Sequence, residues 1–250
     1  MNLRTISRAL ALAWALSLCM IRLALARLRG PLTAVQRALW LQDACRGVLG
    51  SMGVHYSAIG TPPTHGLVVS NHLSYLDIAV YSAIMPCVFV SKAEVNDWPY
   101  FGLASRAGGS IFIDRASKAS AAAAAREIAN RLKLPVPVLL FPEGTSTDGS
   151  QVLRFHSALF RPAIDACVPI TAAALRYLPN GNTPESELCW YGDAGFLPHV
   201  WKLLGAPAFS ATITFSDPIV LSDRRAAAQV THDLVTTLRA EAACETPAHA

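Results

Sequence analysis

After Gly53, short apolar runs of β character alternate with helical stretches, and this alternation strongly limits the folds open to the chain. The β-like runs lie at residues 67–70, 87–90, 111–113, 138–141, 170–175 and 211–215. The alanine-rich helical stretch 117–134 is ended by Pro135 and Pro137, and a last helix is expected over 221–243. Strands that alternate with helices predict an α/β fold with a central mixed sheet flanked by helices.

The positive charge is concentrated at the start of the chain. Residues 1–76 hold seven arginines and one acid, Asp43, a net charge of +6, and because the whole chain carries +4, the remainder carries −2. The charged fraction is only 15%, below the roughly 25% usual for soluble domains. A basic, apolar leader predicts attachment to an anionic membrane surface. Nucleic-acid binding is not expected, because aromatic positions interleaved with Lys and Arg are missing.

The apolar run 9–21 allows three interpretations. It is 13 residues long, shorter than the roughly 20 that cross a bilayer, and Arg22 ends it. It could be a cleaved signal peptide, a full span with snorkelling arginines, or a helix in the membrane interface followed by a second helix over 34–46. We favour a retained anchor that is interfacial or re-entrant. Residues 1–50 are then the membrane-anchoring segment and 51–250 the α/β domain.

Metal and disulfide frameworks are not expected. The six cysteines are scattered, no CxxC occurs, and no histidine lies at a zinc-like spacing from them. Free thiols in a reducing compartment are the favoured interpretation.

His72 and Asp77 are the first candidates for chemistry, because they follow the β-like run 67–70 directly. A histidine oriented by a carboxylate can take a proton from an alcohol, as acyl transfer requires. The alternative is a capping box, in which Ser74 caps a helix and Asp77 folds back from its third position. The two interpretations are compatible, since a carboxylate in the first turn also points back towards His72.

Two further polar segments follow β-like runs. In residues 141–146, Pro142 and Gly144 fix a tight turn whose backbone N–H groups could face an anion, and the alternative is a surface turn with a solvated Glu143. In residues 108–115, Arg115 could grip a phosphate, or could form an ordinary ion pair with Asp114. Lys92 and the aromatic stretch 98–101 suit either a rim beside lipid or core packing.

In this order, these segments resemble the blocks of the glycerolipid acyltransferase family, which includes the bacterial 1-acylglycerol-3-phosphate acyltransferases. Residues 71–77 are similar to its NHxSxxD block, 109–115 to GxxFIDR, 141–145 to FPEGT and 168–170 to VPI. The resemblance covers roughly residues 50–215. Two departures occur: Ser146-Thr147-Asp148 stands where many relatives carry an arginine, and Phe155-His156 replaces a Phe-Lys pair. Residues 189–193, with Pro198-His199, also resemble a branch that acylates lyso-ornithine lipid.

The resemblance implies a membrane-associated acyltransferase of phospholipid biosynthesis, at the cytoplasmic face of the bacterial inner membrane. An acyl carrier protein or CoA thioester would donate the chain, and a lysolipid, first of all 1-acyl-sn-glycerol-3-phosphate, would accept it; no cofactor or metal is expected. His72 and Asp77 would be catalytic. Acceptor binding would fall to Arg115, Glu143, Gly144 and Thr145, with Asn71, Ser74, Gly109 and Pro142 in support. A lipid or thioester hydrolase and a non-catalytic lipid-binding protein remain alternatives.

Overall fold

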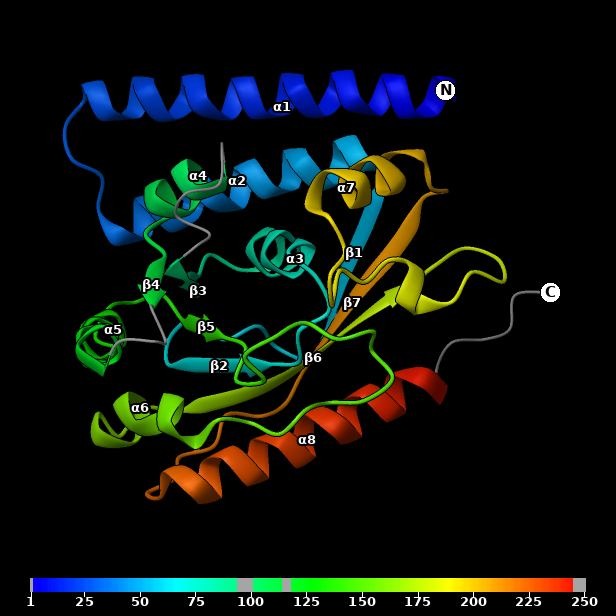
Figure 1. Ribbon diagram of the computed structural model, residues 1–250. Coiled ribbons are helices and arrows are strands. Elements are labelled where there is room, and N and C mark those ends of the chain that lie inside the picture. Colours follow the sequence, from blue (N-terminus) through cyan, green and yellow to red (C-terminus); the bar gives the residue numbers. More distant parts are fainter. Residues whose placement is uncertain (1, 94–100, 114–117, 245–250) are drawn as a thin grey trace.

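The computed structural model describes residues 2–93, 101–113 and 118–244, and it contains a mixed seven-stranded sheet (Figure 1). The strand order is β1-β7-β6-β2-β5-β3-β4, and only the β6–β7 pair is antiparallel among these neighbours. The strands are β1 (Val54–Ile59), β2 (Leu67–Ser70), β3 (Val88–Lys92), β4 (Ile111–Ile113), β5 (Val138–Leu140), β6 (Ile170–Leu178) and β7 (Phe209–Phe215). The predicted fold class is confirmed.

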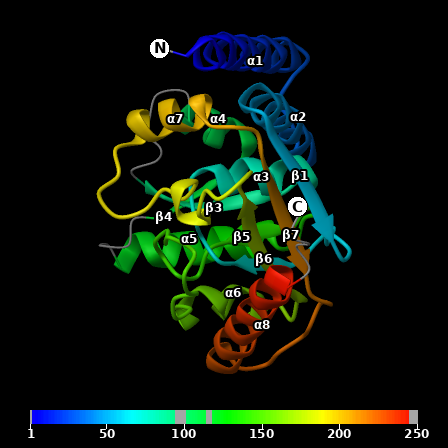
Figure 2. The same cartoon turned by 90° about the vertical axis from the view of Figure 1, so that its right-hand side faces the viewer.

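Helices cover both faces of the sheet (Figures 1 and 2). The α-helices are α1 (Leu3–Leu28), α2 (Ala34–Met52), α3 (Leu76–Ile84), α4 (Phe101–Gly108), α5 (Lys118–Arg131), α6 (Arg161–Asp165), α7 (Phe196–Gly205) and α8 (Arg224–Cys244). Side chains of α2, α3 and α7 pack on one face, and those of α5, α6 and α8 pack on the other. In β2, Val68 faces the first core and Val69 the second, which explains why this strand is apolar throughout.

The edge strand β1 was not predicted. Only Val54 of its six residues is buried, so the strand lacks the alternation of apolar and polar residues that marks a half-buried strand. It is held by parallel pairing with β7. The predicted bounds of β2 and β4 match the structure, whereas β6 runs on to Leu178 and β7 already begins at Phe209.

Helix α1 continues past Arg22, because this arginine is exposed and does not interrupt the packed side of the helix. Its 26 residues correspond to about 39 Å at 1.5 Å per residue. It is long and apolar enough to cross a membrane, yet it lies along the domain beside α2 (Figure 1). Trp40 of α2 donates its indole N–H to the carbonyl of Cys19 at 3.1 Å.

Helix α2 packs against one face of the sheet. It begins with a capping box between Thr33 and Gln36, and Leu49 on its inner side is fully buried in the same cluster as Val68. The division of the chain at residue 50 stays a prediction.

Candidate active site

The candidate site lies where the neighbouring parallel strands β2 and β5 end. His72 follows β2 and Glu143 follows β5, and since the carboxyl ends of parallel strands meet at one edge, the two loops lie together. The site thus forms at the strand ends that the sequence indicates.

His72 and Asp77 form the predicted pair. The imidazole Nδ1 lies 2.7 Å from Oδ2 of Asp77, which is fully buried in the first turn of α3. The ring of His72 stacks on Phe141 at 4.2 Å between centroids, and its side chain keeps 21% exposure. The carboxylate therefore holds Nδ1 and leaves Nε2 as the nitrogen available to a substrate.

The buried Asp77 carboxylate is saturated with donors. Oδ2 also accepts the backbone N–H groups of Leu73 at 2.7 Å and Ser74 at 3.1 Å, and Oδ1 accepts the hydroxyl of Tyr177. Burial, and then the charge of Asp77, raise the pKa of Tyr177 well above its ordinary value, so this hydroxyl is a donor. Both oxygens of Asp77 are thereby held in place as hydrogen-bond acceptors.

The capping-box interpretation is half right. Asp77 does accept the backbone N–H of Ser74, but Ser74 Oγ accepts from Leu76 at 3.3 Å instead of from Asp77. The residue before α3 is Tyr75, which makes no side-chain cap hydrogen bond. The Asp77 carboxylate thus both accepts a backbone N–H just before α3 and orients His72.

Glu143 is a buried side chain that holds the backbone of the His72 loop. It is 4% exposed, so the solvated surface turn is wrong, and its two oxygens accept the backbone N–H groups of His72 and Leu153, each at 2.7 Å. Burial raises the pKa of Glu143, and the two donors oppose that rise. Both oxygens already have protein partners, so the geometry gives Glu143 the task of positioning His72 and does not favour direct contact with the acceptor.

Two other residues hold the backbone of the catalytic loop. Thr147 donates its backbone N–H to the carbonyl of His72 at 2.9 Å, which complements the bond from His72 to Glu143. The buried side chain of Asn71 exchanges two hydrogen bonds with the backbone of Leu175 in β6, at 2.8 and 3.1 Å. The expected supporting role of Asn71 therefore has a structural basis.

The turn after β5 has the expected shape. Gly144 has φ +80°, Pro142 is buried, and the carbonyl of Pro142 accepts the N–H of His156 at 2.9 Å. Gly144 and the exposed Thr145 line the cavity beside His72.

The third predicted segment is described only in part. Gly109 is buried with φ +89°, and Ser110 after it lines the cavity. Asp114, Arg115 and residues 98–100 lie outside the described residues, and the roles predicted for them stay predictions.

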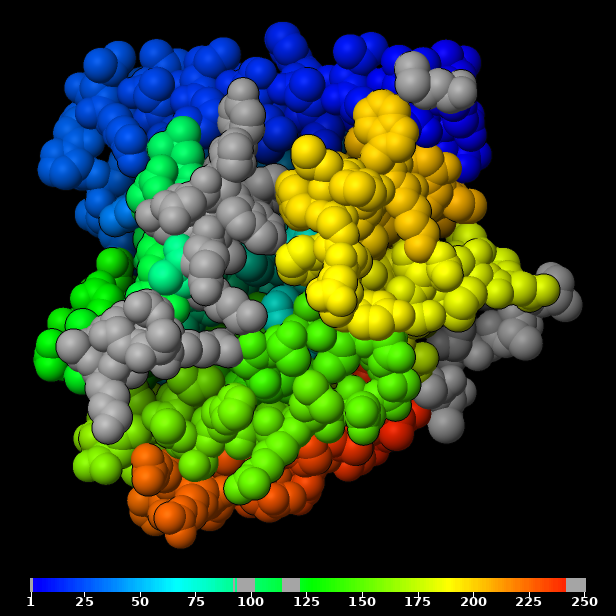
Figure 3. Space-filling view, in the orientation of Figure 1, coloured from blue at the N-terminus to red at the C-terminus, as the bar shows by residue number. Residues whose placement is uncertain are grey.

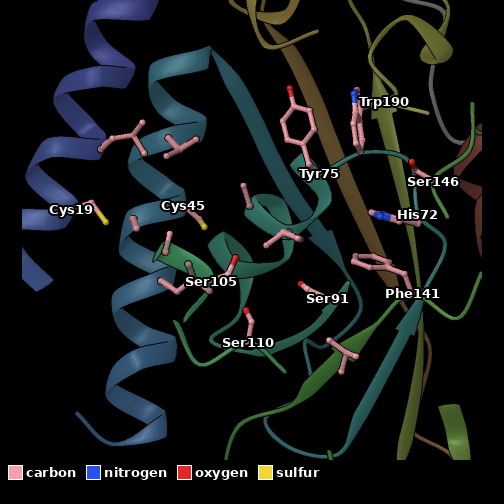
Figure 4. A pocket seen from close by; sticks show the side chains of 18 of the residues that line it. Cys19, Cys45, His72, Tyr75, Ser91, Ser105, Ser110, Phe141, Ser146 and Trp190 are labelled. Atoms are coloured by element: carbon pink, nitrogen blue, oxygen red, sulfur yellow. The ribbon is translucent and has the colours of Figure 1, made fainter. Parts of the chain in front are cut away.

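An apolar cavity of about 450 Å³ leads away from His72 (Figure 4). Its wall contains Tyr75, Phe141 and Trp190 near the histidine, and Cys19 and Cys45 stand at its far end on α1 and α2. The remaining lining is mostly aliphatic and also contains four serines and Gly192: Leu16, Met20, Leu41, Ala44, Val48, Ile78, Ala79, Val90, Ala104, Ser91, Ser105, Ser110, Ser146 and Gly192. The cavity thus joins the catalytic pair to the N-terminal helices.

Within the described part of the chain, no cluster of three His, Cys, Asp or Glu side chains could hold a metal ion. Cys19, Cys45, Cys87, Cys167 and Cys189 are free thiols, and all of these but Cys167 are buried.

Comparison with known proteins identifies the family. The family profile described as Acyltransferase matches residues 59–176. The lyso-ornithine lipid O-acyltransferase of Rhodobacter capsulatus is 38% identical over 186 residues, covering 72% of this chain and 67% of that protein. The chain belongs to the acyltransferase family.

The relatives in this family are named for two different acceptor lipids. The 1-acyl-sn-glycerol-3-phosphate acyltransferase of Neisseria meningitidis serogroup B is 31% identical over 173 residues, or 68% of each chain. The fold matches the crystal structure of the 1-acyl-sn-glycerophosphate (LPA) acyltransferase PlsC from Thermotoga maritima, with a TM-score of 0.64 at 19% identity over 96% of this chain and 95% of that one. The chain is therefore an LPA-acyltransferase-like enzyme.

Proposed function

We propose that this acyltransferase moves a fatty acyl group from an acyl carrier protein or CoA thioester to the free hydroxyl of a lysolipid. The observation that carries the proposal is the placement of the His72–Asp77 pair in the wall of an apolar cavity. The cavity can shelter a hydrocarbon chain, and the pair can activate an alcohol beside it.

In the proposed reaction, Nε2 of His72 takes the hydroxyl proton as the acceptor oxygen attacks the thioester carbonyl carbon. The tetrahedral adduct collapses, its carbon–sulfur bond breaks, and the imidazolium returns the proton to the departing thiolate. Asp77 holds the imidazole tautomer and stabilises the imidazolium. No covalent acyl-enzyme is needed, and the chain contains no GxSxG nucleophile elbow.

For the acceptor we propose lyso-ornithine lipid first and 1-acyl-sn-glycerol-3-phosphate second, which reverses the order expected from the motifs. The relative at 38% identity is named for the former and the one at 31% for the latter. The departures at residues 146–148 and 155–156 also replace cations that would suit a phosphate. Arg115, Gly144 and Thr145 are the residues proposed to contact the acceptor.

The deciding experiment presents one radiolabelled acyl donor and a panel of acceptors to the purified protein in mixed micelles. The panel contains lyso-ornithine lipid, lysophosphatidate and other lysophospholipids. Label in a diacyl product supports the proposal and names the acceptor. Release of free fatty acid with every acceptor would instead identify a hydrolase, and product formation that is unchanged in His72→Ala would refute the mechanism.

The proposed location is the cytoplasmic face of the bacterial inner membrane. The apolar, basic helix α1 supports membrane association, and the thioester donors would be supplied from the cytoplasm.

A further inference from the structure

Helix α7 has an unusual outer face for a surface helix. Its inner side buries His199, Leu203 and Leu204. On the outer side, Leu197 is 75% and Trp201 is 48% exposed, one turn apart. Amphipathic surface helices normally turn charged and polar residues outwards, and here the outer face carries two large apolar side chains.

The C-terminal end of α7 is hydrogen-bonded to helix α1. Arg8 of α1 donates to the carbonyls of Ala206 and Leu204 at the end of α7, at 2.7 and 3.4 Å. Thr5 of α1 is buried against Gly205. Both ribbon views show α7 beneath α1 at the same end of the molecule, and the space-filling view shows the α7 segment rising beside α1 (Figures 1, 2 and 3).

The outer face of α1 has the composition of an interfacial helix. Exposed apolar residues recur at helical spacing along it: Leu3, Leu10, Trp14, Ile21, Leu25 and Leu28. Arg4, Arg22 and Arg27 are exposed among them. An apolar stripe with neighbouring cations suits a helix that lies in the headgroup region of an anionic bilayer.

We infer that α7 is a second membrane contact, and that Leu197 and Trp201 enter the interface of an anionic bilayer beside α1. A lipid surface fits better than a protein partner because the exposed Arg4, Arg22 and Arg27 accompany the apolar residues of α1, and such cations are attracted to anionic lipids. Tryptophan is also a preferred side chain at the membrane interface. The inference rests on one part of the proposed function, namely that the protein works at a membrane.

The contact would orient the catalytic cavity. On the inner side of α7, Nδ1 of His199 lies 3.1 Å from the hydroxyl of Tyr75, and Phe196 packs edge-on against the same ring at 4.8 Å. Tyr75 lines the cavity beside His72. Seating α7 on the bilayer therefore fixes the catalytic end of the cavity relative to the membrane surface, where a lysolipid acceptor resides.

The test measures binding of the full chain to vesicles of phosphatidylcholine and phosphatidylglycerol. Leu197→Glu is compared with Val220→Glu, since Val220 is similarly exposed at 65% but lies between β7 and α8. We expect Leu197→Glu to weaken partitioning by roughly tenfold or more, from the loss of one buried leucine side chain. Val220→Glu should bind like the parent protein.

A second measurement reads the depth of Trp201 directly. The fluorescence of Trp201 is obtained as the difference between the parent protein and Trp201→Phe. Brominated lipids should quench this difference signal. Parent-like vesicle binding by Leu197→Glu, or a Trp201 signal that bromine does not quench, would overturn the inference. Protection of Trp201 by a second copy or by carrier protein, without quenching, would also overturn it. Acyl transfer by the parent protein is measured separately in detergent micelles. A parent protein that binds vesicles but transfers no acyl group would count against the proposed function and not against the membrane contact of α7.

Discussion

Tyr177 donates its hydroxyl hydrogen to Oδ1 of Asp77, the carboxylate oxygen that His72 does not use. The two residues are 100 positions apart in the chain and both are fully buried. The carboxylate is therefore oriented from both sides, by the imidazole at one oxygen and by a strand residue of β6 at the other.

Tyr177→Phe should destabilise the fold by about 1.5–3 kcal/mol, the usual contribution of a buried hydrogen bond to a charged group. It should also lower kcat, because the carboxylate that orients His72 loses one of the donors that hold it. Initial rates of diacyl product and melting temperatures of the variant provide the measurement. Tyr56→Phe on the exposed part of β1 is the matched control. A variant that loses stability but keeps the kcat of the parent would leave Tyr177 with a packing role only.

His72→Ala should reduce acyl transfer by about 10²–10⁴-fold, the usual contribution of a general base. His65→Ala removes an exposed histidine near β2 and should change nothing. Initial rates of diacyl product, with melting curves for both variants, provide the measurement. Near-full transfer by a folded His72→Ala protein would exclude the general-base role.

Glu143→Gln should cost both stability and activity. The glutamine has one carbonyl oxygen, so it can satisfy either His72 or Leu153, and its NH₂ group then faces the other backbone N–H. An unsatisfied buried donor costs about 1–3 kcal/mol, so the melting temperature should fall measurably. A fully stable and active variant would contradict the positioning role of Glu143.

Stability should decline between pH 6.5 and about 4 through His199. Burial lowers the pKa of His199 to about 4, so the unfolded chain takes up a proton at pH 6.5 while the folded chain does not until about 4. The free energy of unfolding therefore falls as pH is lowered through this window. His199→Gln should flatten that part of the curve relative to the parent, and His65→Ala should leave it unchanged; melting temperatures across the window provide the measurement.

Cys19→Phe should shorten the acyl chain that the enzyme prefers, because Cys19 stands at the end of the cavity far from His72 (Figure 4). Each methylene excluded from the cavity costs about 0.8 kcal/mol, or roughly fourfold in kcat/KM. Ala13→Phe, an exposed substitution on the same helix, is the control. Chain-length profiles of the two variants should differ; identical profiles would exclude this cavity as the acyl site.

The sequence predicted those features that are local in the chain. The positions of β2 and β4, the strand-end location of the two polar loops and the His72–Asp77 pair all follow from short patterns. The edge strand β1 could not be predicted, because its hydrogen bonds to β7 are its main support and its side chains are mostly exposed.

The residues missed at the site act across long distances in sequence. Tyr177 lies within an apolar strand, where a tyrosine is ordinarily a packing residue, and nothing in its neighbourhood indicates Asp77. Glu143 was expected to be solvated, because a charged residue in a turn with Pro and Gly is usually exposed to solvent. Its burial depends on two backbone donors, one of them 71 positions away, which no local pattern contains.

Both backbone polar groups of His72 are held by the turn after β5: its N–H by Glu143 and its carbonyl by Thr147. The orientation of the base is therefore a joint product of two chain segments. An engineer who transplants the His72 loop into another scaffold, or exchanges it between relatives, would have to move residues 141–147 with it as one unit.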